Sequence, residues 1–361
     1  MHYKTWSKLV ALSGFFIIFS LAMINYVIDP FNIFHTQFFP KQFQMNERFI
    51  KVEFLQEHHA DYNGYIFGSS RIGTTSPRTI EKYHQNTHFY NMSLSAANME
   101  DYLSHLKYFI DNNYPIDTLY LQIDLVDTLI GYGHPKDRYL TKKHPYIVGD
   151  SLLSYYISYL TIYSSSDLKG KLQKNLASDK QEKDLEKVIY DLEDTGTWGR
   201  PNKELALKDD AEQYIKNVKS FHIPDPENTY RKDIKSYPKI ITAFKEINQI
   251  CLENNIEFIV FTTPHNHNML HGVNSEDAMM FMRDLVSIHD LWYFSGYNSI
   301  TTNDENYYES SHYRPYIGDL IAAKIFHDTT IDIPKNFGIL LTTQNINTFV
   351  PNELKRLKDS Y

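Results

Sequence analysis

Two short segments, far apart in the chain, carry side chains that could together perform acyl transfer. The first is Gly68-Ser69-Ser70, which follows an apolar run and presents a hydroxyl at a tight turn that Gly68 permits. The second is Glu309-Ser310-Ser311-His312, in which a carboxylate ahead of a histidine can hold one imidazole nitrogen. The other nitrogen could take a proton from a serine hydroxyl, which is a weak nucleophile without such a base. Each segment alone is ordinary loop composition, so the prediction of a Ser-acid-His site rests on the pair.

The elements around these segments predict strands that alternate with helices. Short apolar runs predict strands over residues 65–67, 88–92, 119–125 and 257–264. Helices are expected after the N-cap residue Asn98, over about 238–254 and over 314–327. This pattern predicts an α/β fold, a three-layer α/β/α arrangement with a mostly parallel sheet. Ligands of such sheets bind beyond the carboxyl ends of the strands, which is where Ser70 falls.

We expect the α/β domain to cover residues 63–334, between a juxtamembrane stalk over 31–62 and a C-terminal extension over 335–361. From about 135 to 235 the alternation is lost, which predicts a largely helical insertion that serves as a lid or docking surface. Within it, Ser178-Asp179-Lys180-Gln181 resembles a capping box that opens a helix with Leu185, Ile189 and Leu192 on one side.

The N-terminal segment predicts a membrane anchor over residues 1–30. The run from Leu9 to Ile28 carries no charge and is long enough, at about 20 residues, to cross a bilayer core. Because Lys4 and Lys8 precede it, we expect a cytoplasmic N-terminus and a single-pass protein of the cytoplasmic membrane. The domain would then be extracytoplasmic, either periplasmic or at the cell surface. A signal peptide cleaved after Ser20-Leu21-Ala22 is the alternative.

The composition of the chain limits the classes of function that it can have. A net charge of −8 argues against a nucleic-acid partner, which would need a basic face. Aromatic residues make up 15% of the chain, which suits a bulky core or a cleft that packs against sugar rings. Cys251 is the single cysteine, so no intramolecular disulfide can form, and its apolar surroundings predict a buried thiol.

The order Ser, acid, His, with the serine after the first strand and the acid–His pair before the last helix, resembles the SGNH hydrolase superfamily. It is most similar to the membrane-anchored branch with the teichoic-acid D-alanyl transfer protein and the alginate O-acetyltransferases. The resemblance covers roughly residues 60 to 128 and 255 to 327. It implies an SGNH or flavodoxin-like fold, with Ser70 as nucleophile, His312 as base and Glu309 as acid. Glu309 stands where the family has Asp, and Asp304 is the nearest other acid.

The middle blocks of the family match loosely. Ser95 takes the position of a glycine whose N–H helps to form the oxyanion hole, so the resemblance implies a hole made by Ser70, Ser95 and the side chain of Asn98. The Gly-x-Asn-Asp block is absent, and Gln122-Ile123-Asp124-Leu125-Val126-Asp127 stands there instead.

Other polar side chains fall near the expected site. Arg71 and Arg314 flank the nucleophile and the base and could bind an anionic substrate group, or pair with nearby acids. His265, followed by His267 and His271, lies after the fourth strand and could contact substrate. No cysteine or close carboxylate completes a metal set there, so we expect no metal and no cofactor.

The leading interpretation is a serine-dependent O-acyltransferase or esterase that acts on a cell-envelope or secreted glycan through an acyl-enzyme. Transfer would require an acyl donor, for which the resemblance implies a multi-span membrane acyltransferase partner. The alternative is a catalytically silent subunit of the same fold that binds glycan or assists assembly, and a lipid esterase is a third possibility.

Overall fold

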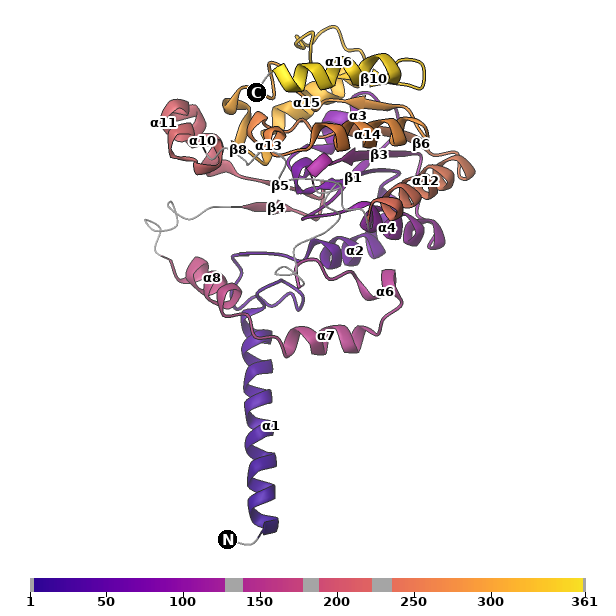
Figure 1. Ribbon diagram of the computed structural model, residues 1–361. Coiled ribbons are helices and arrows are strands. Elements are labelled where there is room, and N and C mark those ends of the chain that lie inside the picture. The colour runs from indigo at the N-terminus through magenta and orange to yellow at the C-terminus, as the bar shows by residue number, and fades with distance from the viewer. Residues whose placement is uncertain (1–2, 127–138, 178–187, 223–235, 360–361) are drawn as a thin grey trace. The chain divides into compact units, whose positions relative to one another are not determined.

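The computed structural model describes residues 3–126, 139–177, 188–222 and 236–359, and the chain divides into two compact units (Figure 1). One unit combines residues 1–53 with 136–187, and the other combines 54–135 with 188–361. The region expected as a single insertion over about 135–235 is therefore shared between the units.

A six-stranded sheet forms the centre of the second unit. Its order is β10-β7-β6-β3-β1-β2, and every neighbouring pair is parallel except β10 with β7. The strands are β1 (Gly64–Ser69), β2 (Phe89–Leu94), β3 (Thr118–Ile123), β6 (Glu257–Thr262), β7 (Leu291–Tyr293) and β10 (Ile339–Leu341). The predicted α/β class with a mostly parallel sheet is confirmed.

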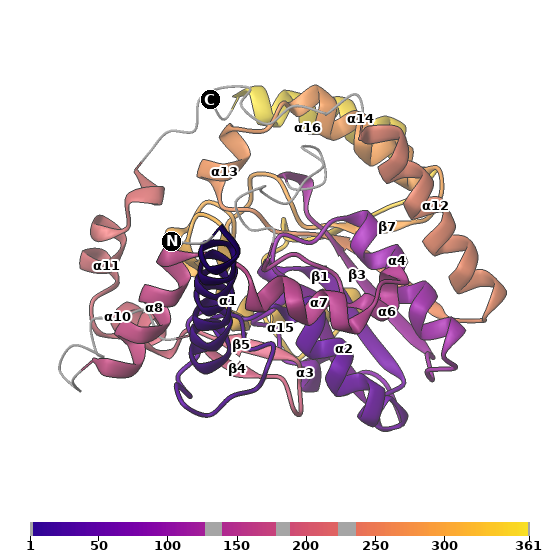
Figure 2. The same cartoon turned by 90° about the horizontal axis from the view of Figure 1, so that it is seen from below.

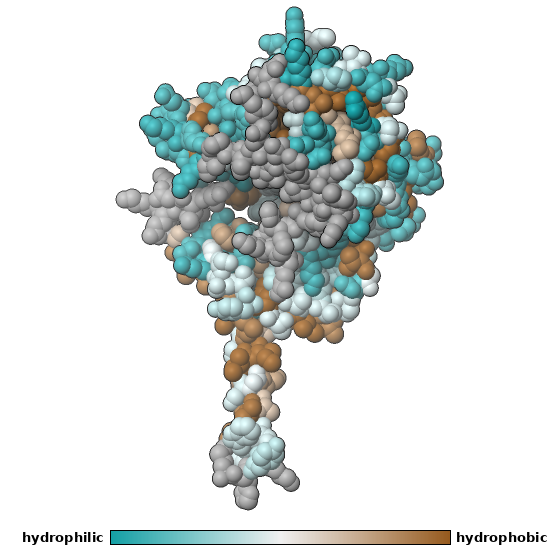
Figure 3. Space-filling model, in the orientation of Figure 1, coloured by the Kyte–Doolittle hydropathy of each residue, from teal (hydrophilic) through white to brown (hydrophobic). Residues whose placement is uncertain are grey.

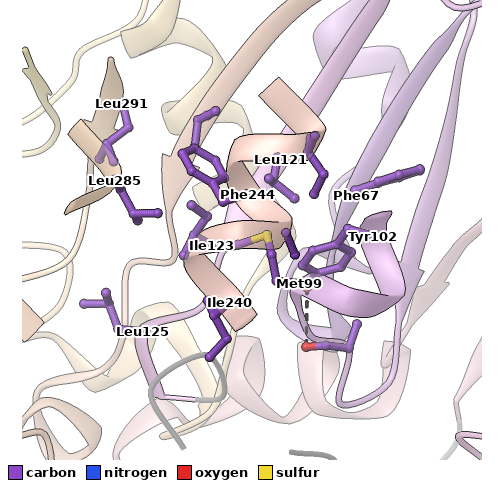
Figure 4. Packing of buried hydrophobic residues seen from close by; sticks show 14 of the residues in the cluster. Phe67, Met99, Tyr102, Leu121, Ile123, Leu125, Ile240, Phe244, Leu285 and Leu291 are labelled. Atoms are coloured by element: carbon purple, nitrogen blue, oxygen red, sulfur yellow. Dashed lines mark hydrogen bonds between the residues drawn. The ribbon is translucent and has the colours of Figure 1, made fainter. Parts of the chain in front are cut away.

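Both faces of this sheet are buried. Tyr65 and Phe67 of β1 pack in one apolar cluster while Ile66, between them, packs in another, because successive side chains point to opposite faces. The first cluster includes residues of α4, α12, α14 and α16, and Figure 4 shows its packing around Phe67, Leu121 and Phe244. The second includes residues of α3 and α15. These helices span Pro77–Glu81 (α3), Met99–Asp111 (α4), Tyr237–Glu253 (α12), Ser275–Val286 (α14), Pro315–Ile325 (α15) and Ile346–Asp359 (α16).

Helices next to one another in space come from distant parts of the chain. Figure 2 shows α12 beside α4 and α14 beside α16, and both pairs are in contact. The start of α4 is fixed by a reciprocal capping box in which the Asn98 side chain accepts from Asp101 N and the Asp101 side chain accepts from Asn98 N. Cys251 is buried in α12, as the sequence predicted, and burial raises the pKa of its thiol to about 12.

The predicted helix over residues 178–192 is wrong where it can be judged. Ser178, Asp179, Lys180, Gln181 and Leu185 lie outside the described residues, but Ile189 lies in strand β4 (Ile189–Asp191). This strand pairs antiparallel with β5 (Thr197–Gly199), because Gly196 adopts a positive φ of 71° that turns the chain back. The hairpin leads into α10 (Pro201–Asp209) and α11 (Ala211–Asn217).

The first unit contains the N-terminal helix α1 (Tyr3–Ile28). Its segment Thr5–Ile28 is long and apolar enough to cross a membrane, and apolar side chains are exposed along its length (Figure 3). A turn held by Asp29, whose carboxylate accepts from Ile33 N and Phe34 N, follows the helix. The unit also contains α6 (Pro145–Val148), α7 (Leu152–Leu160), α8 (Ser165–Leu176) and the beginning of α2 (Glu47–His58).

Candidate active site

Ser70 lies immediately beyond the carboxyl end of β1, in the 3-10 turn Ser70–Ile72. Its Oγ atom lies 2.9 Å from Nε2 of His312 and is partly exposed. Ser69, by contrast, is fully buried, and its Oγ accepts a hydrogen bond from Arg71 N at 3.4 Å. Of the two neighbouring serines, only Ser70 is positioned to exchange a proton with the histidine.

His312 and Glu309 are held together by a short antiparallel hairpin that precedes α15. The hairpin is formed by β8 (Tyr307–Glu309) and β9 (His312–Tyr313), in which Glu309 and His312 are direct partners. Nδ1 of His312 makes a short hydrogen bond to Oε1 of Glu309. Ser70, His312 and Glu309 therefore form a continuous chain of hydrogen bonds, although the first is separated from the others by more than 200 residues.

Asp304, the other acid considered, does not belong to this chain. Its Oδ1 atom accepts from Asn266 Nδ2 at 2.8 Å and lies 3.2 Å from His267 Nε2. These contacts also occupy one of the histidines that follow β6.

The electrostatic surroundings favour a neutral histidine beside an ionised glutamate. Burial lowers the pKa of His312, and the nearby charges of Arg200 and Arg71 act in the same direction, against the raising effect of Glu309. Burial raises the pKa of Glu309, but the hydrogen bond with His312 and the charges of His312, Arg200 and Lys203 outweigh it, so the pKa lies well below the ordinary range. A neutral imidazole at neutral pH can accept the proton of a serine hydroxyl.

Two cations that the sequence analysis missed fix the glutamate. Arg200 Nη1 lies 2.7 Å and Lys203 Nζ 2.9 Å from Oε2 of Glu309, the oxygen that faces away from His312. Trp198 approaches the His312 ring edge-on, with the ring centroids 5.5 Å apart, and the Arg200 guanidinium lies over the indole. A Trp and two cations in a region without apolar periodicity gave no signal that linked them to residue 309.

The β4–β5 hairpin that carries Trp198 is hydrogen-bonded to the segments around the nucleophile. Trp198 N donates to Gly73 O at 2.9 Å, and Asn91 N donates to Thr195 O at 2.9 Å. Gly196 packs so closely here that an added Cβ would lie 2.3 Å from Asn91 O. The loop after Ser70, the strand β2 and the cations on Glu309 are thus joined by one hairpin.

A second polar cluster lies behind the nucleophile, centred on Asp124 at the end of β3. Asp124 Oδ2 makes a short ion pair with Arg71 Nη1, and Oδ1 lies 3.2 Å from His265 Nε2. All three side chains are almost completely buried, with Arg71 only 4% exposed. His265 was predicted to contact substrate, and Arg71 either to do so or to pair with an acid, and the structure places both as buried partners of Asp124. The reason is that the buried carboxylate requires charged and hydrogen-bonding partners.

Arg314, the third residue predicted to contact substrate, is bound by an acid. Its Nε and Nη2 atoms donate to Glu204 of α10 at 3.0 and 2.7 Å, a bidentate geometry that occupies the planar guanidinium edge. This ion pair is the second of the two roles that the sequence left open.

The predicted oxyanion residues lie at the same edge of the sheet. In the β1–β2 pairing Ser69 is the partner of Leu94, so Ser70 and Ser95 leave adjacent parallel strands at equivalent positions. The side-chain oxygen of Asn98 caps α4 by accepting from Glu100 N and Asp101 N.

Within the described part of the chain, no group of three or more His, Cys, Asp or Glu side chains is arranged to hold a metal ion. Comparison of the chain with models of known protein families gives no match, and no sequence among curated proteins matches it.

Proposed function

We propose that this protein is a membrane-anchored serine O-acyltransferase or esterase with a three-layer α/β/α fold of the SGNH type. The observation that carries the proposal is the 2.9 Å contact between Ser70 Oγ and His312 Nε2, together with the hydrogen bond from the other ring nitrogen, Nδ1, to Glu309. Nucleophile, base and orienting acid in this order form the arrangement by which hydrolases of unrelated folds activate serine.

In the proposed reaction, Ser70 Oγ attacks the carbonyl carbon of an ester or thioester while its proton passes to His312 Nε2. The tetrahedral intermediate collapses, the bond to the leaving group breaks, and His312 gives the proton to the leaving alcohol or thiol. The acyl group is then carried as an ester on Ser70. An acceptor hydroxyl, or water, attacks this ester with His312 again as base, which releases the product and restores the serine.

Glu309 has a positioning role in this scheme. It fixes the tautomer with the proton on Nδ1 of His312 and stabilises the imidazolium that forms during proton transfer. Arg200 and Lys203 keep Glu309 ionised, and the backbone N–H groups of Ser70 and Ser95 would stabilise the negative oxygen of the intermediate.

We further propose that α1 anchors the protein in the cytoplasmic membrane and that the catalytic unit lies outside the cytoplasm. An acceptor there would be a hydroxyl group of a cell-envelope or secreted glycan. Transfer, as opposed to hydrolysis, would depend on a multi-span membrane acyltransferase that delivers the acyl group.

The test is turnover of a small aryl acetate by the full chain in detergent, with two variants that differ in which neighbouring serine is removed. Ser70→Ala should abolish turnover above background, while Ser69→Ala, which removes only weak contacts of 3.4 to 3.5 Å, should retain most of it. Equal activity of Ser70→Ala and the unaltered chain would reject the proposal.

A catalytically silent glycan-binding or assembly subunit of the same fold is the second candidate. The observation that favours it is Asp124, which stands near the place of the missing Gly-x-Asn-Asp block and is buried in an ion pair with Arg71. Failure of the unaltered chain both to turn over the ester and to react with a serine-directed phosphonate would favour this candidate.

A further inference from the structure

Helix α7 of the first unit exposes a stripe of apolar side chains. Leu153 and Ile157 lie four residues apart, the spacing that places residues on one face of a helix, and the partly exposed Leu160 follows them. Leu153 is 70% and Ile157 49% exposed, although the helix contains no charged residue. Exposed apolar patches of this kind usually mark a surface that meets a protein or a membrane.

The opposite face of α7 is fixed within the same unit. Tyr155 and Tyr159 are buried and their hydroxyl groups accept from Nδ2 of Asn46 at 3.0 and 2.8 Å. Phe49 stacks on Tyr155 with ring centroids 5.0 Å apart. Tyr156, at the side of the helix, packs against Phe34 and Phe49, so the apolar side chains that point away from the unit are those of Leu153 and Ile157.

The end of α7 is tied to the apolar helix α1. Nδ2 of Asn25, near the end of α1, donates to Leu160 O and Ile162 O at 2.8 Å each. These two carbonyls lie at the C-terminus of α7, where backbone acceptors lack helical partners. Figure 1 shows α7 extending to one side from the end of α1, crosswise to the axis of that helix.

The length of α1 places this junction at the boundary of a bilayer. The 24 residues of Thr5–Ile28 extend about 36 Å, compared with about 30 Å for the hydrocarbon core. Asn25 lies about 4.5 Å before the end of the helix, so in a centred helix it falls within about 2 Å of the edge of the hydrocarbon core. The hydrogen bonds from Asn25 then hold the end of α7 near the edge of the hydrocarbon core.

We propose that α7 is an interfacial helix whose exposed face, with Leu153 and Ile157, lies in the surface of the lipid bilayer beside α1. The occupant of this surface is lipid, because the patch is continuous with the helix that enters the membrane and lacks charge. Exposed Tyr163, just after α7, and Tyr146 in α6 add the aromatic residues that favour the membrane interface. The inference rests on the membrane anchor of the proposed function. It adds α7 as a second contact between the first unit and the membrane, one that limits tilting of this unit.

The experiment measures the depth of a fluorescent label in the full chain reconstituted into phosphatidylcholine–phosphatidylglycerol vesicles. A polarity-sensitive label is attached at Ile157→Cys or, as a second variant, at Leu153→Cys, and is quenched by lipids that carry a spin label near the headgroup. Phe16→Cys in α1 reports insertion of the anchor. Leu252→Cys, an exposed position of α12 in the other unit, is the matched control, and the native Cys251 is buried.

We expect quenching at residues 153 and 157 at least twofold greater than at residue 252. Residue 16 should be quenched by lipids that are spin-labelled deep in the acyl chain if α1 is inserted. If residue 16 is quenched in this way but residues 153 and 157 are quenched no more than residue 252, the interfacial helix is overturned and the anchor stands. Absence of quenching at all four positions would overturn both the anchor and this inference.

Discussion

Arg200 Nη1 lies 2.7 Å from Oε2 of Glu309, the carboxylate oxygen opposite to the one that binds His312. Both oxygens of the acid are therefore engaged, one by the histidine and one by cations from a segment about 100 residues earlier in the chain. This contact makes the orientation and charge of Glu309 depend on the β4–β5 hairpin and on α10.

The charge of Arg200 should be measurable in the pH dependence of ester turnover. Because Arg200 lowers the pKa of His312, Arg200→Met should raise that pKa and move the acid limb of the kcat/KM profile to higher pH. Arg78→Met, which removes a cation from an exposed pair with Asp194, should leave the limb in place. An unchanged or lowered acid limb in Arg200→Met would contradict the role of Arg200.

Replacement of the acid separates its charge from its shape. Glu309→Gln keeps a side chain of the same length but cannot hold His312 in the required tautomer, so we expect kcat to fall by up to roughly 10⁴-fold. Glu309→Asp keeps the charge on a shorter side chain and should lose less. Steady-state turnover of the aryl acetate by both variants is the measurement, and a Gln variant as active as the unaltered chain would exclude Glu309 as the orienting acid.

The same carboxylate should make stability depend on pH. The pKa of Glu309 in the folded protein lies below the ordinary value of 4.5, so the ionised carboxylate stabilises the folded state at pH values above 4.5. This stabilisation is lost as the pH falls through the pKa of the folded protein. The difference in unfolding free energy between the unaltered chain and Glu309→Gln should therefore be largest near pH 7 and shrink below about pH 4.5. A difference that grows on acidification would have the wrong sign.

The hairpin can be tested at its tightest contact. Gly196→Ala places a methyl group 2.3 Å from Asn91 O at a positive φ, which should cost about 1–3 kcal/mol in strain or release the hairpin. We expect lower ester turnover and faster hydrogen exchange at the amides of Asn91 and Trp198. Gly199→Ala is the matched control, since an added Cβ there has no atom within 4 Å.

The buried ion pair behind Ser70 should matter far more than an exposed pair of the same type. Asp124→Asn leaves the Arg71 guanidinium buried without its carboxylate, a change that typically costs about 3–5 kcal/mol. Asp194→Asn breaks the exposed pair with Arg78, for which about 0–1 kcal/mol is expected. Denaturant unfolding of both variants measures the contrast, and equal destabilisation would contradict it.

The elements that were predicted correctly are ones whose cause is local. The apolar runs predicted β1, β2, β3 and β6, and Asn98 does cap α4, because alternation and capping depend on neighbouring residues. Strand β7 was missed, although its apolar run is no shorter than the one that predicted β1. Helix α14 was not predicted, although Asn274 caps it and its apolar residues recur at helical spacing.

The residues that surround the site could not be predicted, because they are brought there by contacts between distant parts of the chain. The pairing of Ser70 with His312 could be predicted because each residue borders a recognisable element. Trp198 lies in a hairpin, followed by Arg200 and Lys203, within a region that was expected to be largely helical, so nothing in the sequence linked these residues to Glu309. The burial of Arg71 and His265 likewise follows from Asp124, which only the sheet order brings between them.

Covalent labelling of Ser70 tests the central claim most directly. The full chain is treated with a serine-directed fluorophosphonate, digested, and analysed by mass spectrometry, alongside His312→Ala. We predict a stoichiometric adduct on the peptide at Ser70 in the unaltered chain and strongly reduced labelling in His312→Ala, because the base activates the hydroxyl. A folded chain that remains unlabelled at Ser70, or that labels equally well without His312, would contradict the account.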